Sequence, residues 1–148
     1  MSQEGIFAIK LSELERQYKQ TMNCLQLCQT EDHKTIRQEL EEVFEAYRDA
    51  EHRLLKDVNT SRSPAVSALS QAQLTYDRRI RKILQEELPG YLHEDGSSFS
   101  ADQVEAISLY GEYAIDFAVQ AMRCAHLAVL SALDAQISLD EQEQEDSI

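Results

Sequence analysis

Small residues recur at alternating spacings of three and four over the last long helical stretch of the sequence, from Val104 to Leu139. The residues of this stripe are Gly111, Ala114, Ala118, Ala121, Ala125, Ala128, Ala132 and Ala135. Because an α-helix has about 3.6 residues per turn, the stripe lies along one helix face, where short side chains let a neighbouring helix approach closely. Larger apolar residues flank the stripe, and the polar side is narrow. The pattern therefore predicts a helix at the centre of a bundle.

Three earlier segments carry a narrower apolar stripe at the same spacing, which is typical of outer helices buried along one seam. They run over about residues 5–28, 31–58 and 64–88. Capping and breaking residues set their limits. Thr30, followed by two acids, is the predicted N-cap of the second segment, Ser63 caps the third with Pro64 at its first position, and Pro89-Gly90 ends it.

The longest connection covers residues 91–99 and leads into the last helix. Ser100 and Gln103 have the spacing of a capping box, in which each side chain bonds the other residue's backbone N–H. The tail over residues 140–148 contains five acids and Ile148 as its only apolar residue. Too little apolar surface is present to offset the entropy of ordering the tail, so we expect it to be disordered.

These elements predict an all-α fold, an antiparallel four-helix bundle with a long, central C-terminal helix, in which residues 1–139 form one domain. No glycine or proline occurs between Gln17 and Thr35. One continuous helix through the first two segments, giving an elongated three-helix bundle, is therefore the alternative. The composition also favours a helical fold, because the 148 residues include only four Gly and two Pro, the residues that are least favourable in helices.

The formal net charge of −13 changes the range of expected partners. Sequence-independent binding to nucleic acid or anionic lipid needs a basic surface, so we expect neither nucleic acid nor membrane as a partner. No segment approaches the roughly 20 apolar residues that cross a bilayer. Charged residues interrupt the N-terminal stretch where a signal peptide needs its apolar core, and the three cysteines are an odd number. We therefore expect reduced thiols and a cytoplasmic protein.

One acidic group in the second segment could hold a metal. Glu41, Glu42 and Glu45 match the EExxE half of the signature of the all-α nucleotide pyrophosphohydrolases of the MazG kind, and the sequence resembles that family over these five positions. The resemblance implies a Mg²⁺-dependent enzyme with a second acidic pair, for which Glu112 and Asp116 are the nearest analogue, one residue longer than the family spacing. The buried seam of the same segment turns the glutamates toward solvent, which favours an ordinary exposed acidic face.

A basic stretch within the third segment is the main concentration of positive charge, and it comprises Arg78, Arg79, Arg81 and Lys82. It could bind an anion, a nucleic acid or an acidic partner. Five consecutive helical residues cover more than one turn, however, so the cations spread around the outside of the helix while Ile80 points inward. An exposed face paired with local acids is the favoured interpretation.

No complete catalytic set is recognisable. The sequence lacks a Gly-x-Ser-x-Gly elbow, a glycine-rich phosphate loop and a plausible Ser-His-Asp set. His126 lies on the apolar border of the last helix, where a neutral core histidine is favoured over a ligand or base. We therefore expect no cofactor.

The favoured hypothesis is a non-catalytic protein that acts through protein–protein interaction as an adaptor, a small chaperone or a regulator. The small-residue stripe seats either a helix of the same chain or a second copy, and we expect a homodimer. The alternatives are the Mg²⁺-dependent nucleotide pyrophosphohydrolase and an anion or nucleic-acid binder acting through residues 78–82.

Overall fold

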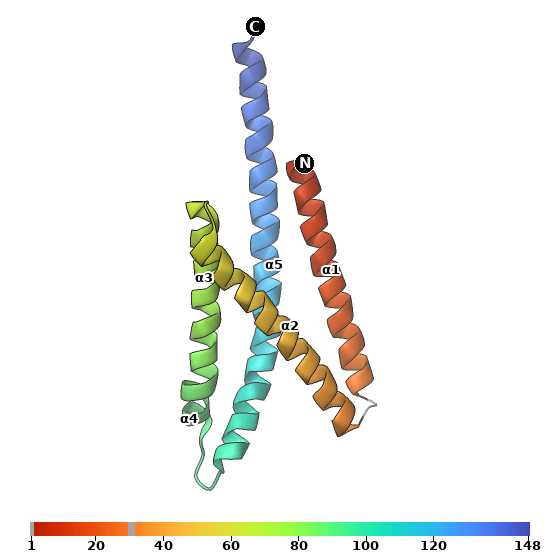
Figure 1. Ribbon diagram of the computed structural model, residues 1–148, viewed down its shortest axis with the longest axis vertical. Coiled ribbons are helices and arrows are strands. Elements are labelled where there is room, and N and C mark those ends of the chain that lie inside the picture. Colours follow the sequence, from red (N-terminus) through yellow and green to blue (C-terminus); the bar gives the residue numbers. More distant parts are fainter. Residues whose placement is uncertain (1, 30–31) are drawn as a thin grey trace. The chain divides into compact units, whose positions relative to one another are not determined.

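The computed structural model describes residues 2–29 and 32–148, except for the side chains of Gln3 and Cys28, and its regular structure over those residues is entirely helical (Figure 1). The prediction of an all-α fold is confirmed. The elements are α1 (Gln3–Cys28), α2 (His33–Thr60), α3 (Pro64–Lys82), a π-helical turn η1 (Ile83–Glu87), the short helix α4 (Leu88–Leu92) and α5 (Phe99–Asp146).

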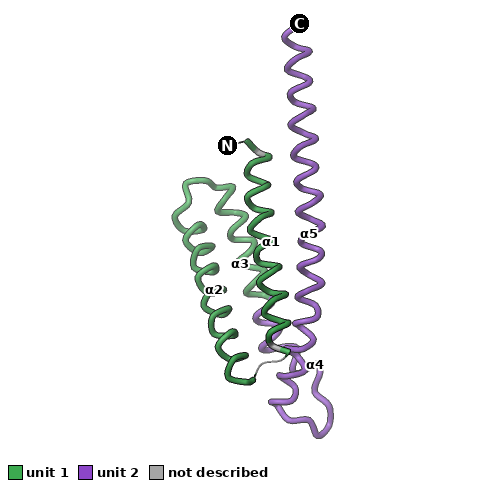
Figure 2. The backbone as a smooth tube through the Cα atoms, turned by 90° about the vertical axis from the view of Figure 1, so that its right-hand side faces the viewer, with its two compact units in different colours: residues 1–79 green, residues 80–148 purple. Residues whose placement is uncertain are grey.

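The chain divides into two compact units, residues 1–79 and residues 80–148 (Figure 2). The first holds α1, α2 and most of α3, and the second holds the end of α3 with η1, α4 and α5. A single domain over residues 1–139, antiparallel packing of the helices along their lengths and the central place of the last helix stay predictions.

In the first unit, α1 and α2 are separate helices, as the favoured boundary predicts. Asp32 caps α2 with an extended backbone, and its Oδ1 accepts the Thr35 N–H at 2.9 Å. The continuous-helix alternative is therefore wrong, and Thr30, the predicted cap, lies outside the described residues. The two helices meet where the Cys24 thiol donates to Glu39 Oε2 at 3.7 Å.

The chain reverses direction between α2 and α3 in a short turn (Figure 1). Ser63 caps α3 as predicted, because its Oγ accepts the Val66 N–H at 3.4 Å with Pro64 in the first helical position. The Ser67 hydroxyl donates to the Val58 carbonyl at 3.1 Å, which ties the start of α3 to the end of α2. Ser70 and Leu74, about one and two turns further along α3, are buried.

The prediction that Pro89-Gly90 ends the third helix is wrong. The helical backbone widens into η1, where the Leu88 N–H bonds the Ile83 carbonyl five residues back, and α4 then continues to Leu92. The wide turn shifts the hydrogen-bond register, so Pro89 falls in the first turn of α4, where a missing N–H leaves no intrahelical bond unmade. Pro89 is buried at this position.

Both predicted limits of the last helix need correction. Ser98, not Ser100, is the N-cap of α5, and its Oγ accepts the Ala101 N–H at 3.1 Å. At the other end α5 continues to Asp146 rather than ending at Leu139. No glycine or proline follows Gly111, and the glutamates and glutamines of the tail have good helix propensity, so no residue stops the helix earlier. Whether the tail is ordered in solution stays a prediction.

Gly96 forms the turn between α4 and α5 in the left-handed region, with φ 87°. Gly96→Ala is expected to lower the free energy of unfolding by about 1 kcal/mol, because an L side chain is strained at this φ. Nothing lies within 4 Å of an added Cβ at Gly96 or at Gly111. Gly111→Ala, inside a helix, is therefore the matched control and should stabilise by about 0.5–1 kcal/mol. Chemical denaturation of both variants measures the two effects, and a destabilisation of equal size in both would contradict this explanation.

Candidate functional site

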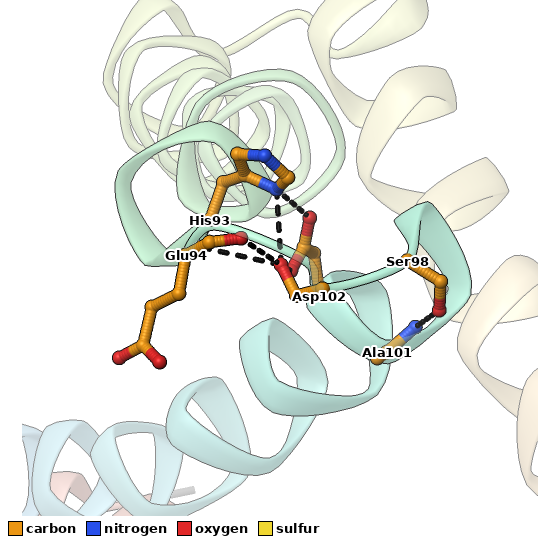
Figure 3. Close-up of polar contacts among 6 residues, drawn as sticks. His93, Glu94, Ser98, Ala101 and Asp102 are labelled. Carbon is orange, nitrogen blue, oxygen red and sulfur yellow. Dashed lines mark hydrogen bonds and ion pairs between the residues drawn. The ribbon is translucent and has the colours of Figure 1, made fainter.

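A polar cluster joins the loop after α4 to the first turns of α5 (Figure 3). The His93 Nδ1 lies 2.7 Å from Asp102 Oδ2, and the Ser97 hydroxyl donates to Asp102 Oδ1 at 2.7 Å. The Ser97 Oγ also lies 3.0 Å from His93 Nδ1. An ionised carboxylate only accepts hydrogen bonds, so the short Asp102 contact places the imidazole hydrogen on Nδ1. Asp102 is only 4% exposed, whereas His93 is exposed.

These three residue types are those of a hydrolytic triad, but their geometry does not suit nucleophilic catalysis. In a triad the carboxylate binds one imidazole nitrogen and the serine hydroxyl donates to the other. Here Asp102 and Ser97 both approach Nδ1. The imidazole therefore cannot accept the serine proton, and the cluster serves to hold the loop against the start of α5.

The ionisation of Asp102 is coupled to this cluster. The hydrogen bond from Ser97, followed by that from His93 and the attraction of the His93 charge, lowers the pKa of Asp102 below its ordinary value, against the opposing effect of burial. A carboxyl with a lowered pKa in the folded state stabilises the fold above its unfolded pKa, and this contribution is lost as the pH falls through the folded pKa.

Asp102→Asn is therefore expected to lower the Tm by several degrees at pH 7, because the amide loses the charged acceptor that binds Ser97 and His93. The difference from the wild type should begin to shrink as the pH falls through the ordinary aspartate value of about 4, and it should disappear only below the lowered pKa of Asp102 in the folded state. Asp116→Asn, at an exposed position of the same helix, is the control. Thermal unfolding followed by circular dichroism at both pH values measures the effect. A difference that does not change with pH would contradict the assigned role of the carboxylate.

A shallow pocket of about 390 Å³ lies beside the cluster. It is lined by Gln85, Glu86, Pro89, Gly90, His93, Phe99 and Asp102. The polar atoms of Asp102 are already bound by its neighbours in the loop, and the pocket is open to solvent. The pocket therefore has the features of a corner between helices and offers no convergent set of catalytic groups.

The acidic residues of the proposed metal site lie on two helices of different units. Glu41, Glu42 and Glu45 are exposed on α2, and Glu112 and Asp116 are exposed on α5. Over residues 2–29 and 32–148, no group of three or more His, Cys, Asp or Glu side chains is placed to hold a metal ion. The pyrophosphohydrolase alternative stays a prediction.

The cations of the basic stretch lie on the last turns of α3. Arg78, Arg79 and Lys82 are exposed, and Arg81 is half-buried. The neighbouring carboxylate of Asp77 accepts a hydrogen bond from Gln73 at 3.0 Å. Anion or nucleic-acid binding through residues 78–82 stays a prediction.

Within the unit of residues 80–148, the stripe of small residues on α5 is not buried. Ala114, Ala125 and Ala132 are half-buried, and Gly111, Ala118, Ala121 and Ala128 are exposed. The prediction of a core histidine is wrong, because His126 is exposed. The role of the stripe as a helix-packing or dimer seam stays a prediction.

Few of the described apolar residues are buried. Over the part that the structure describes, the buried apolar residues of the core are Leu74 and Ala106, and Pro89 is buried in α4. Large apolar side chains are exposed along α1, α2 and α5. These helix faces, rather than a cleft, are the candidate functional surface of the molecule.

Sequence reasoning missed the cluster of His93, Ser97 and Asp102. The signal that could have found the cluster is Ser98. With Ser98 as the N-cap, Asp102 lies on the first turns of α5, next to the loop that carries His93 and Ser97. None of the described helices combines the length and the apolar character that a membrane span requires. No family model, curated protein or solved structure matches the chain.

Proposed function

We propose that this chain is a non-catalytic helical protein of the cytoplasm that acts through protein–protein interaction, as an adaptor, a small chaperone or a regulator, and that it self-associates. The observation that carries the proposal is the exposed apolar surface of its helices. In α1, Leu14, Tyr18 and Leu25 are exposed, and in α5, Ile115, Leu130 and Ile137 are exposed.

Covering these apolar side chains is energetically favourable. Burying a leucine or isoleucine side chain contributes about 1.5–3 kcal/mol relative to leaving it in water. Single exposed apolar residues are ordinary, but contiguous patches larger than a few hundred Å² mark interaction surfaces. A helix with apolar residues repeated over many turns provides such a patch. We therefore expect the surface of a partner to bind this face of the helix.

The charge of the chain restricts the partners. With a net charge of −13, the molecule favours neutral or basic protein surfaces and repels nucleic acid and anionic lipid. Residues 78–82 cover more than one helical turn, so the spacing of Arg78, Arg79, Arg81 and Lys82 favours no concentrated basic surface. Protein recognition through apolar faces is therefore favoured over binding of anions.

Light scattering coupled to size exclusion, together with quantitative mass spectrometry of proteins that co-purify under native conditions, tests the proposal. We expect a stable complex, formed either by copies of the chain or with a second protein at a fixed stoichiometry. A chain that stays monomeric at high micromolar concentration and retains no stoichiometric partner would refute the interaction role.

A further inference from the structure

We propose that a second copy of this chain covers the exposed face of α5 that carries its larger apolar residues, and that the two α5 helices pair antiparallel with the twofold axis at His126. This inference rests on the proposed function and names its partner. The face, called here the α5 ridge, consists of Ile115, Val119, Met122, His126, Leu130, Leu133 and Ile137.

Within the unit of residues 80–148, the α5 ridge is a continuous and accessible surface. Its residues follow one another at spacings of three and four, so they lie on one helix face beside the small-residue stripe. Ile115 is 64% exposed and Met122 is 40% exposed, and the exposed fractions of Val119, Leu130 and Ile137 lie between these values. The ridge contains no Asp, Glu, Lys or Arg. It therefore has the apolar character of a helix–helix interface.

Elements of the same unit are too short to cover the ridge. In the unit of residues 80–148, η1 and α4 have five residues each, whereas α5 has 48. The buried residues of α5, Asp102 and Ala106, lie near its beginning. From Ile107 to Asp146 no residue of α5 is buried. The cover of the ridge must therefore come from outside this unit.

The spacing of the ridge is symmetric about His126. Met122 and Leu130 each lie four residues from His126, Val119 and Leu133 each lie seven away, and Ile115 and Ile137 each lie eleven away. In a homodimer with twofold symmetry, a residue i of one copy contacts a residue j of the other, and residue j of the first copy contacts residue i of the second. An antiparallel pair centred on His126 thus places Met122 against Leu130 and Ile115 against Ile137 of the second copy, with every ridge residue matched.

The distribution of acids favours the antiparallel pair over the parallel one. The segment 140–146 carries five acids and no base. In a parallel pair the two acidic segments would lie side by side at the 8–10 Å separation of packed helices, which is close to the screening length of about 8 Å at physiological salt. In the antiparallel pair this segment faces residues 106–112 of the second copy, where Glu112 is the only acid. The antiparallel arrangement therefore avoids most of the repulsion.

The length of the ridge is sufficient for a dimer. From Ile115 to Ile137 an α-helix extends about 33 Å at about 1.5 Å per residue. A helix pair of this length buries on the order of 600 Å² on each copy, which reaches the lower end of the range for specific interfaces. A dissociation constant in the micromolar range is the expected consequence.

The test compares two substitutions in the full chain by sedimentation equilibrium. Met122→Glu places two carboxylates in the apolar contact and is expected to raise the dissociation constant of the dimer about 100-fold. Leu127→Glu makes a matched change on the polar side of the same helix, where Leu127 is 69% exposed, and should leave the constant within about threefold of the wild type. Circular dichroism of both variants confirms that the helices are retained.

A double variant tests the orientation. In Met122→Glu/Leu130→Lys, the antiparallel pair places each glutamate against a lysine of the other copy. The dissociation constant of the dimer should therefore be at least tenfold lower than in Met122→Glu alone. In a parallel pair, like charges face each other and no recovery occurs. Independently, spin labels at an Ile115→Cys position, with the native cysteines replaced by serine, should lie about 33 Å apart in the antiparallel dimer and about 10 Å apart in a parallel one.

Each other outcome overturns the inference. A wild type that is monomeric at high micromolar concentration means that the first unit or a different protein covers the ridge, and a co-purifying partner would then leave the proposed function intact. A dimer that persists in Met122→Glu uses another surface. Short spin–spin distances at position 115, or no recovery in the double variant, exclude the antiparallel arrangement.

Discussion

Leu74→Ala is expected to lower the free energy of unfolding by about 2–5 kcal/mol. Leu74 is 1% exposed and is the largest side chain that is fully buried among the described residues. Removing three carbons from a closed site loses their transfer free energy and leaves a cavity that the neighbours fill only in part. A loss of this size is a large fraction of the stability of a typical domain, which is about 5–15 kcal/mol.

Leu69→Ala is the matched control for this prediction. It removes the same atoms from the same helix, but Leu69 is 74% exposed. A surface substitution of this kind changes stability by about 0.5 kcal/mol or less. Urea denaturation followed by circular dichroism measures both variants. Equal midpoints for Leu74→Ala and Leu69→Ala would show that Leu74 is not part of a closed core.

Ala106→Leu is expected to destabilise the fold by about 1–3 kcal/mol, because the added carbons need space that a packed site does not have. Ala106 is 1% exposed and lies one turn beyond Asp102 on α5, so the larger side chain would press on the start of the helix where the loop cluster is attached. The Tm should fall by several degrees as a result.

Ala118→Leu is the corresponding control, since Ala118 is exposed on the same helix. Leucine has nearly the helix propensity of alanine, so the Tm of this variant should stay within a few degrees of the wild type. Differential scanning calorimetry compares the two variants. An unchanged Tm for Ala106→Leu would mean that space exists beside Ala106 and that the first turns of α5 are loosely packed.

Sequence periodicity predicted the helical class and most helix limits, because these depend on local spacing and capping residues. Ser63 and Pro64 begin α3 as predicted, and α1 ends at Cys28. The continuation through Pro89 was not predictable in this way. A π-helical turn depends on a shift of hydrogen-bond register over five residues, and single-residue rules for proline assume a regular α-helix.

The candidate surface was predicted less completely than the fold. Spacing identified the small-residue stripe of α5, but it does not say whether a face is covered by the same chain or by another molecule. His126 was expected in a core and is exposed. The contacts of His93 and Asp102 depend on how a loop folds back, which is set by the positive φ of Gly96 and the cap at Ser98. The spacing of residues along the sequence does not predict these loop contacts.

Amide hydrogen exchange over residues 111–139, measured across a series of protein concentrations, decides whether a second copy covers α5. Amides of an unsupported helix open frequently, whereas amides at a helix–helix interface exchange only after the contact dissociates. We expect protection of this segment to rise with concentration, in step with the dimer fraction measured by light scattering. Exchange that is independent of concentration, whether fast throughout or slow throughout, would contradict the α5 interface.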